Sequence, residues 1–127
     1  MHRENKITVL VVEPERKPYT KVIDNTLHSL QREVGGYIQA IYPFEDEVAI
    51  ICDEEAKINN KPLNRSLRDS SGEIYDIIAG TFLVVGLTED NFGSLSDEQL
   101  RKYSKRFEKP ELFVRCNGKI YSLLLQL

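Results

Sequence analysis

The sequence predicts an α+β fold, with a largely antiparallel sheet and two main helices. Short apolar runs rich in β-branched residues recur along the chain and are separated by polar turns, which is typical of strands. Two other segments repeat apolar residues every three or four positions, which is the spacing of a helix. Because runs of strands are interrupted by only two helices, an antiparallel arrangement is favoured.

The first two strands are expected at residues 7–12 and 19–23. The first is an unbroken run of β-branched and apolar residues, Ile7–Val12. A polar turn bounded by Pro14 and Pro18 follows it. We therefore expect the second strand to return antiparallel to the first.

A short helix is expected to end at the pair Gly35-Gly36. Leu27, Leu30 and Val34 lie on one face of this helix. Three consecutive residues could cap its first turn, and the sequence does not choose among them: Asp24, Asn25 and Thr26. Gly35 suits the C-cap because glycine adopts positive φ without steric cost.

Two strands follow the helix, at residues 37–42 and 48–52. The first has apolar residues on both faces and ends at Pro43, which has no N–H for a strand ladder. The second is the continuous apolar run Val48–Cys52. Such a run predicts a central strand that is covered on both faces.

The middle of the chain is expected to be mostly loop. Residues 53–65 are rich in turn-forming residues, including Asn59, Asn60 and Pro62, and residues 66–72 are expected to continue as loop or as a single helical turn. Residues 73–78 have an ambiguous pattern. A further strand is expected at residues 81–85.

The C-terminal part predicts a second helix and a hairpin. Ser96 and Gln99 form a capping-box pattern, and an apolar stripe follows it until Pro110: Leu100, Tyr103 and Phe107. The pair Asn117-Gly118 predicts a tight turn between strands at 112–116 and 119–123. Residues 123–127 are apolar, so we expect them to dock on the core or on a partner.

Length and charge limit the class of protein. At 127 residues the chain is expected to form one domain, residues 1–127. The net charge of −3 and the pI of about 5.4 disfavour a general nucleic-acid-binding protein, which ordinarily has a basic surface. The second helix does carry basic residues, which could contact phosphate or an acidic partner, although the solvated side of an amphipathic helix is the favoured interpretation: Arg101, Lys102, Lys105, Arg106 and Lys109.

The sequence also indicates a cytoplasmic protein without membrane contact. The longest apolar runs fall far short of the roughly 20 residues that span a bilayer. The N-terminus lacks the apolar segment of a signal peptide. We therefore expect Cys52 and Cys116 to be two buried free thiols and not a disulfide.

The polar segment from Asn59 to Arg68 is the best candidate for a ligand site. As an exposed loop it would present amide and guanidinium groups to a small anionic or nucleotide-like ligand, since arginine binds phosphate and carboxylate bidentately. Tyr37 or Tyr42 could stack on a base. The candidate residues are Asn59, Asn60, Lys61, Asn64, Arg65, Arg68 and Tyr37. A surface loop stabilised by its own asparagine turns explains the same residues without a ligand.

No catalytic residue, metal site or cofactor is predicted. The acidic triplets at 45–47 and 53–55 lie at opposite ends of one strand, so we expect a solvated rim and not a shared centre. His2 and His28 have no partner at the spacing of metal ligands. The chain contains no nucleophile motif and no phosphate-binding glycine loop. We therefore do not expect an enzyme.

Four short motifs carry a family resemblance: Glu33-Val34-Gly35-Gly36-Tyr37-Ile38, Leu63-Asn64-Arg65, Asp76-Ile77-Ile78-Ala79-Gly80-Thr81 and Phe113-Val114-Arg115. Together they resemble the domain-of-unknown-function family 3846, from about Ile7 to Arg115. Its members are small proteins of phages and of conjugative or integrative elements. The resemblance implies a cytoplasmic accessory protein of a mobile element, in host take-over or counter-defence, and assigns no catalytic residue.

Two functions are open on this evidence. The first is non-enzymatic binding of a host or element-encoded protein, with residues 123–127 and aromatics such as Tyr19 as anchors. The second is sequestration of a small molecule or nucleotide by the Asn59–Arg68 segment. We favour the first, and a homo-oligomer is compatible with both.

Overall fold

The computed structural model describes residues 5–125 and has an α+β fold in which every strand pairing is antiparallel. The helices are α1 (Leu27–Val34) and α2 (Asp97–Arg106). The strands are β1 (Lys6–Val12), β2 (Tyr19–Asp24), β3 (Ile38–Ile41), β4 (Val48–Asp53), β5 (Leu63–Arg68), β6 (Ile74–Ala79), β7 (Phe82–Leu87), β8 (Phe92–Gly93), β9 (Glu111–Cys116) and β10 (Lys119–Leu124). The predicted fold class is thus confirmed.

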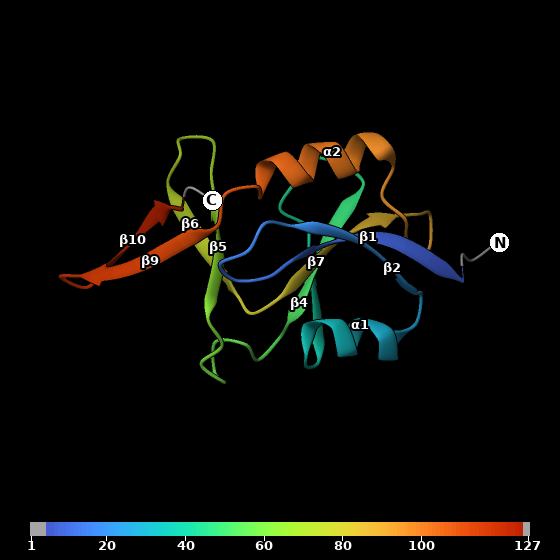
Figure 1. Ribbon diagram of the computed structural model, residues 1–127, viewed down its shortest axis with the longest axis horizontal. Helices are drawn as coiled ribbons and strands as arrows, with labels where there is room; N and C mark the ends of the chain where they lie inside the picture. Colours follow the sequence, from blue (N-terminus) through green and yellow to red (C-terminus); the bar gives the residue numbers. More distant parts are fainter. Residues whose placement is uncertain (1–4, 126–127) are drawn as a thin grey trace.

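The main sheet has the strand order β2-β1-β7-β4-β3, and the short β8 also pairs with β7. The two helices lie on opposite faces of this sheet, with α1 below it and α2 above it in Figure 1. The central strands β1, β4 and β7 therefore have apolar side chains on both faces. This is why they appear in the sequence as continuous apolar runs and not as an alternating pattern.

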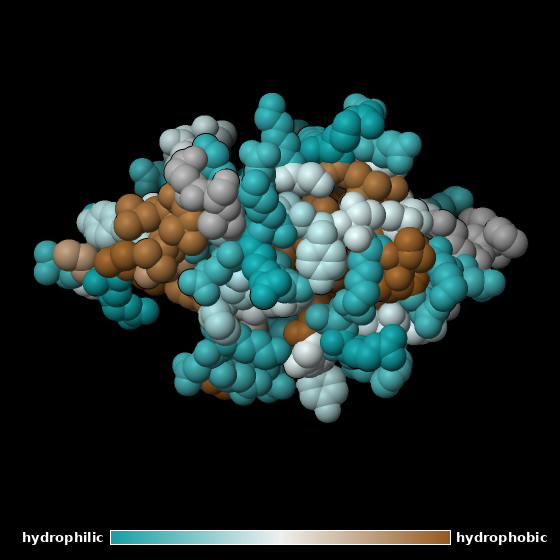
Figure 2. All heavy atoms as spheres, in the orientation of Figure 1, coloured by the Kyte–Doolittle hydropathy of each residue, from teal (hydrophilic) through white to brown (hydrophobic). Residues whose placement is uncertain are grey.

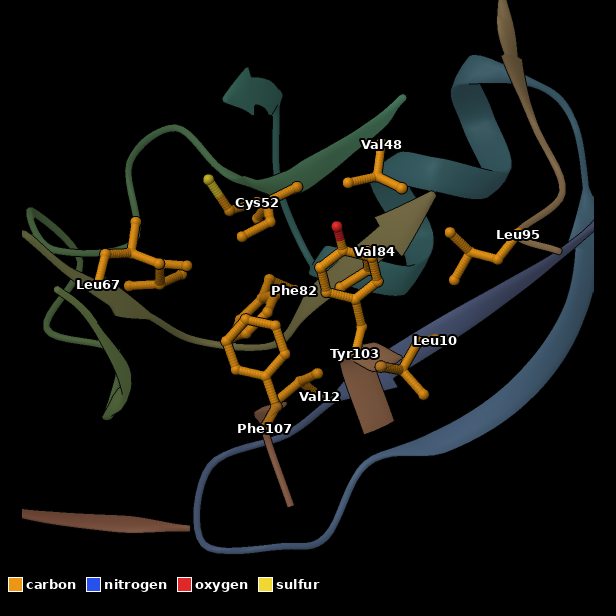
Figure 3. Packing of buried hydrophobic residues seen from close by; sticks show 12 residues of the cluster. Leu10, Val12, Val48, Cys52, Leu67, Phe82, Val84, Leu95, Tyr103 and Phe107 are labelled. Carbon is orange, nitrogen blue, oxygen red and sulfur yellow. The ribbon is translucent and has the colours of Figure 1, made fainter. Parts of the chain in front are cut away.

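Each face of the sheet has its own apolar core. Beneath α1, Val9, Ile51 and Leu83 pack with Leu30 and Val34 of the helix. On the α2 side, strand residues that point to the other face of the sheet pack with the aromatic side chains of the helix and its cap, as Figure 3 shows: Leu10, Val12, Val48, Phe82, Val84, Tyr103 and Phe107. The period-two alternation of a strand thus divides one run of residues between two cores.

The helix ends follow the expected capping chemistry. Thr26 is the N-cap of α1, where its Oγ1 accepts a hydrogen bond from the N–H of Ser29. Gly35 closes α1 with φ 76°. Ser96 and Gln99 form the predicted capping box of α2. Of the three residues on the apolar stripe of α1, only Leu30 and Val34 reach the core, and Leu27, the first residue of the helix, is exposed.

Two separate hairpins, β5–β6 and β9–β10, lie at the opposite end of the molecule from the N-terminus (Figure 1). The loop expected over residues 63–72 is corrected here, since Leu63–Arg68 is strand β5. The ambiguous segment at 73–78 contributes its partner, β6. The predicted turn at Asn117-Gly118 is present, with positive φ at both residues.

Candidate functional site

Asn64 and Arg65, the centre of the expected ligand loop, are buried inside the fold. Nδ2 of Asn64 donates to the carbonyl oxygens of Val12 at 2.9 Å and Gly80 at 2.8 Å. Its Oδ1 accepts from Nη1 of Arg65 at 2.8 Å. These bonds join β5 to the main sheet, so the expectation that Asn64 is presented to solvent is wrong.

Arg65 is only 1% exposed and bonds to main-chain oxygens. Its Nη2 donates to the carbonyl oxygens of Arg16, at 2.6 Å, and of Phe107, at 3.0 Å, and Nε also donates to Phe107. The side chain thereby fixes β5 against the turn after β1 and the C-terminal end of α2. Burial lowers the pKa of this guanidinium, and a nearby carboxylate, Glu111, opposes that shift. Arg65 therefore presents no donor to a ligand at the surface.

The other candidate residues lie in three different places. Asn60 and Lys61 line a hollow of about 700 Å³ between the two hairpins, and Asn59 is exposed in the turn just before them. Arg68 lines a second hollow, beside the end of α2. Tyr37 is exposed and lines a third, shallow hollow against α1. The structure therefore does not gather these residues into one site.

Two carboxylates of the acidic triplets, which were expected to form a solvated rim, make contacts that hold the fold together. Asp53 is buried and forms an ion pair with Lys61, whose Nζ also donates to the carbonyl of Gly35 at the end of α1. Burial raises the pKa of Asp53, but the hydrogen bond and charge of Lys61 and the main-chain N–H of Glu55 together outweigh burial, so the pKa is lowered. Asp46 accepts a hydrogen bond from Oη of Tyr103 at 2.8 Å, which fixes α2 to the loop before β4.

The hollow between the hairpins combines cationic and apolar groups. Lys57, Lys61 and Arg115 line it, together with Tyr75 and one carboxylate, Asp76. Both lysines are already paired, Lys57 with Asp76 and Lys61 with Asp53. Arg115 is thus the only cationic group of the hollow without an ion pair to a described residue.

The hairpin β9–β10 carries a group of exposed apolar side chains on its two neighbouring strands. Leu112 lies opposite Leu123, and Val114 lies opposite Tyr121. These four side chains point away from the body of the molecule and are between 41% and 53% exposed. We call this group the outward face of the hairpin. Figure 2 shows brown, apolar atoms gathered at this end of the molecule.

The outward face is held in place by a buried carboxylate on the other side of the hairpin. Oε1 of Glu111 accepts from the hydroxyls of Ser66 and Ser122, both at 2.6 Å. Its Oε2 accepts from the main-chain N–H of Ser66 at 3.0 Å. Glu111 thus joins β9 and β10 to β5, and the hairpin is part of the folded body and not a loose appendage.

The sequence predicted this hairpin but not its outward face. The face could have been predicted from the sequence, because side chains alternate between the two faces of a strand. Leu112 and Val114, and likewise Tyr121 and Leu123, are two positions apart and so lie on one side of the hairpin. Residues 123–127 were expected to dock on the core or on a partner. Leu123 and Leu124 belong to β10 and are exposed, so they do not dock on the core. Gln126 and Leu127 lie outside the described residues.

The two cysteines differ in environment. Cys52 is buried in β4, and burial raises the pKa of its thiol to about 11. Cys116 is exposed on β9, on the same side of the strand as Val114, so the expectation of two buried thiols is wrong for this residue. The described part of the chain contains no cluster of three metal-binding side chains, and neither of its helices is long and apolar enough to cross a membrane.

Comparison with known proteins supports the family resemblance. A family model described as a domain of unknown function, DUF3846, matches residues 7–108. The chain belongs to this family. No curated protein and no solved structure matches it. The DUF3846 match covers the main sheet, both helices and β5–β6, and ends before the β9–β10 hairpin begins at Glu111.

Proposed function

We propose that this protein is a non-enzymatic protein-binding module, and that the outward face of the β9–β10 hairpin is its docking surface. The exposure of Leu112, Val114, Tyr121 and Leu123 carries this proposal. A contiguous exposed apolar patch is a feature of interaction sites. Tyr121 is the expected anchor, because tyrosine is enriched among residues that dominate binding energy.

The chemistry around the face indicates the kind of partner. Lys119 lies opposite Cys116, on the same side of the hairpin as the outward face, and is exposed at its tip, and Lys109 is exposed at its base. We therefore expect a partner protein with an apolar segment bordered by acidic side chains. Full burial of the four half-exposed side chains would contribute on the order of 4 kcal/mol before the entropic cost of association.

The proposed biological setting comes from the family. We infer that the protein acts in the bacterial cytoplasm as an accessory protein of a phage or conjugative element, in host take-over or counter-defence. Membership of DUF3846 supports this setting by association with other members, not by any residue of this chain.

Quantitative affinity capture from a bacterial host lysate tests the protein-binding proposal. The variant Leu112→Thr/Tyr121→Thr removes apolar side chains from the face and retains residues suited to a strand. Val22→Thr is the matched control, because Val22 is an exposed strand residue on the distant β2. We expect wild type and control to retain the same stoichiometric partner and the double variant to lose it. If all three proteins retain the partner equally, the outward face is not the docking surface.

A second candidate function is binding of a small anionic or nucleotide ligand in the hollow between the hairpins. Asn60, Lys61, Arg115 and Tyr75 line it, and Tyr75 is exposed enough to stack on a base. Arg65, an expected ligand residue, does not line this hollow and is buried. Titration with ATP as a probe should show binding that Arg115→Ala weakens, and no binding to wild type would remove this candidate.

A further inference from the structure

The outer edge of β10 has main-chain groups that no described residue pairs with. The tight Asn117-Gly118 turn makes Cys116 and Lys119 a hydrogen-bonded pair, and such pairs alternate along an antiparallel ladder. The bond from the N–H of Leu125 to the carbonyl of Pro110, at 2.8 Å, continues the same phase. Tyr121 and Leu123 therefore bond to β9, whereas the N–H and C=O groups of three residues point away from it: Ile120, Ser122 and Leu124.

This edge lacks the features that protect the other exposed strands. β2 carries the charged residues Lys21 and Asp24 and two ion pairs, with Glu33 and Lys6. β3 has only four residues and is followed closely by Pro43, and the β5–β6 ladder has register shifts. β10 is regular over six paired residues and contains one charged residue, Lys119, at its start. Long regular apolar edges readily pair with another strand.

The outward N–H and C=O groups of β10 can pair with the same groups of a second copy of this chain related by a two-fold axis. Ile120, Ser122 and Leu124 are equally spaced, so a two-fold axis at Ser122 places Ile120 opposite Leu124 of the second copy. The same axis places Tyr121 opposite Leu123 of the second copy. Apolar residues then meet apolar residues on both sides of the ladder, and no like charges lie opposite each other.

We infer that two copies of this protein pair through antiparallel β10 strands into one four-stranded sheet. The three N–H groups of each copy would donate to the second copy, which gives six main-chain hydrogen bonds. A two-stranded ribbon becomes a four-stranded sheet, which is inherently more stable. The outward faces of the two hairpins would become continuous. This inference concerns the edge of the hairpin and goes beyond the proposed docking on its face.

Sedimentation or light scattering over a concentration series tests the pairing of intact protein. Leu124→Pro removes the N–H of residue 124, which points away from β9, so all hydrogen bonds between β9 and β10 remain. Leu124→Ala removes the side chain and leaves that N–H in place. Two of the six bonds are lost in the proline dimer, so we expect its dissociation constant to rise about tenfold or more. We expect Leu124→Ala to shift it far less. A wild type that is monomeric throughout, or equal dimerisation of the two variants, would overturn the inference.

A charge-mixing experiment decides the question if Leu124→Pro does not fold. Tyr121→Glu places a carboxylate opposite Leu123 of the second copy, and Leu123→Lys places an ammonium group opposite Tyr121. Each variant alone should dimerise weakly, and an equimolar mixture should form a heterodimer. Val114 lies on the outward face but not on the β10 edge, so Val114→Thr should dimerise as strongly as the wild type. Weak association of the mixture, or loss of the dimer on Val114→Thr, would contradict pairing through β10 without bearing on the capture experiment.

Discussion

At the scale of single residues, the polar side chains that organise this fold are the ones that a sequence most easily suggests as a binding site. Asn64 and Arg65 lie among turn formers in the sequence and have the right chemistry for an anion. In the structure they bond to carbonyl oxygens of Val12, Arg16 and Phe107. These acceptors are 40 or more positions away in the chain. No local pattern could have predicted them, because every residue offers the same carbonyl group.

Replacement of Arg65 by methionine should strongly destabilise the protein. The methionine fills much of the volume but leaves the buried carbonyl oxygen of Phe107 and the partly buried one of Arg16 without these donors. We expect a loss of roughly 3–5 kcal/mol in the free energy of unfolding, measured by urea denaturation. Arg68→Met is the control, because Arg68 is exposed on the same strand, and it should change stability by less than about 1 kcal/mol. Similar effects of the two substitutions would contradict the structural role of Arg65.

The bond between Tyr103 and Asp46 should make stability depend on pH in the acidic range. The hydrogen bond from Tyr103 is the main reason that the pKa of Asp46 is lowered below its ordinary value of 3.8. A lowered pKa means that ionised Asp46 stabilises the folded state at pH values above the ordinary value. This contribution is lost as the pH falls through the lower pKa of the folded protein.

Tyr103→Phe measures that contribution. At pH 7 we expect the variant to be less stable by about 1–2 kcal/mol, since the bond is to a charged acceptor that is partly exposed. The difference from wild type should narrow below pH 4, as followed by urea denaturation at several pH values. A difference that stays constant down to pH 2 would show that the charge of Asp46 is not involved.

At the scale of elements, the sequence predicted what depends on local chemistry. The strands of the main sheet, the cap at Gly35, the capping box at Ser96 and the turn at Asn117-Gly118 all follow from neighbouring residues. Strand β5 was missed because Pro62 and the polar residues after it resemble a loop. Its burial depends on the helix and the turn that pack against it, which are distant in the sequence.

Glu111 should control how firmly the β9–β10 hairpin is attached. Glu111→Ala removes the acceptor for Ser66 and Ser122, so hydrogen–deuterium exchange of the hairpin amides should become faster. The exchange of β1, β4 and β7 should change much less, because their packing does not involve this residue. Glu108→Ala, an exposed neighbour, should have little effect on either region. Uniformly faster exchange in the Glu111 variant would indicate a general loss of stability instead.

At the scale of the whole molecule, the residues that match the DUF3846 family form the main body, and the β9–β10 hairpin follows them in the chain. The body has two buried cores and uses its conspicuous polar residues in its own hydrogen bonds. The hairpin exposes apolar residues on its outward face and a strand edge that no described strand pairs with. The candidate site could not be predicted fully from the sequence, because it depends on which side of the ribbon Glu111 attaches to the body. Two surfaces of one hairpin therefore carry the proposed interactions.

The alkylation rate of Cys116 in a host lysate tests the central claim most directly. Cys116 is exposed beside the outward face, whereas Cys52 is buried with a raised thiol pKa, so a maleimide should label one thiol of the native protein. We predict that Cys116 reacts rapidly in purified protein and several-fold more slowly in lysate. The variant Tyr121→Thr should restore rapid labelling in lysate. A cysteine introduced on β2 by Thr20→Cys, in a Cys116→Ser background, should react equally in both. Equal rates for Cys116 in purified protein and in lysate would contradict the claim that a partner covers this face.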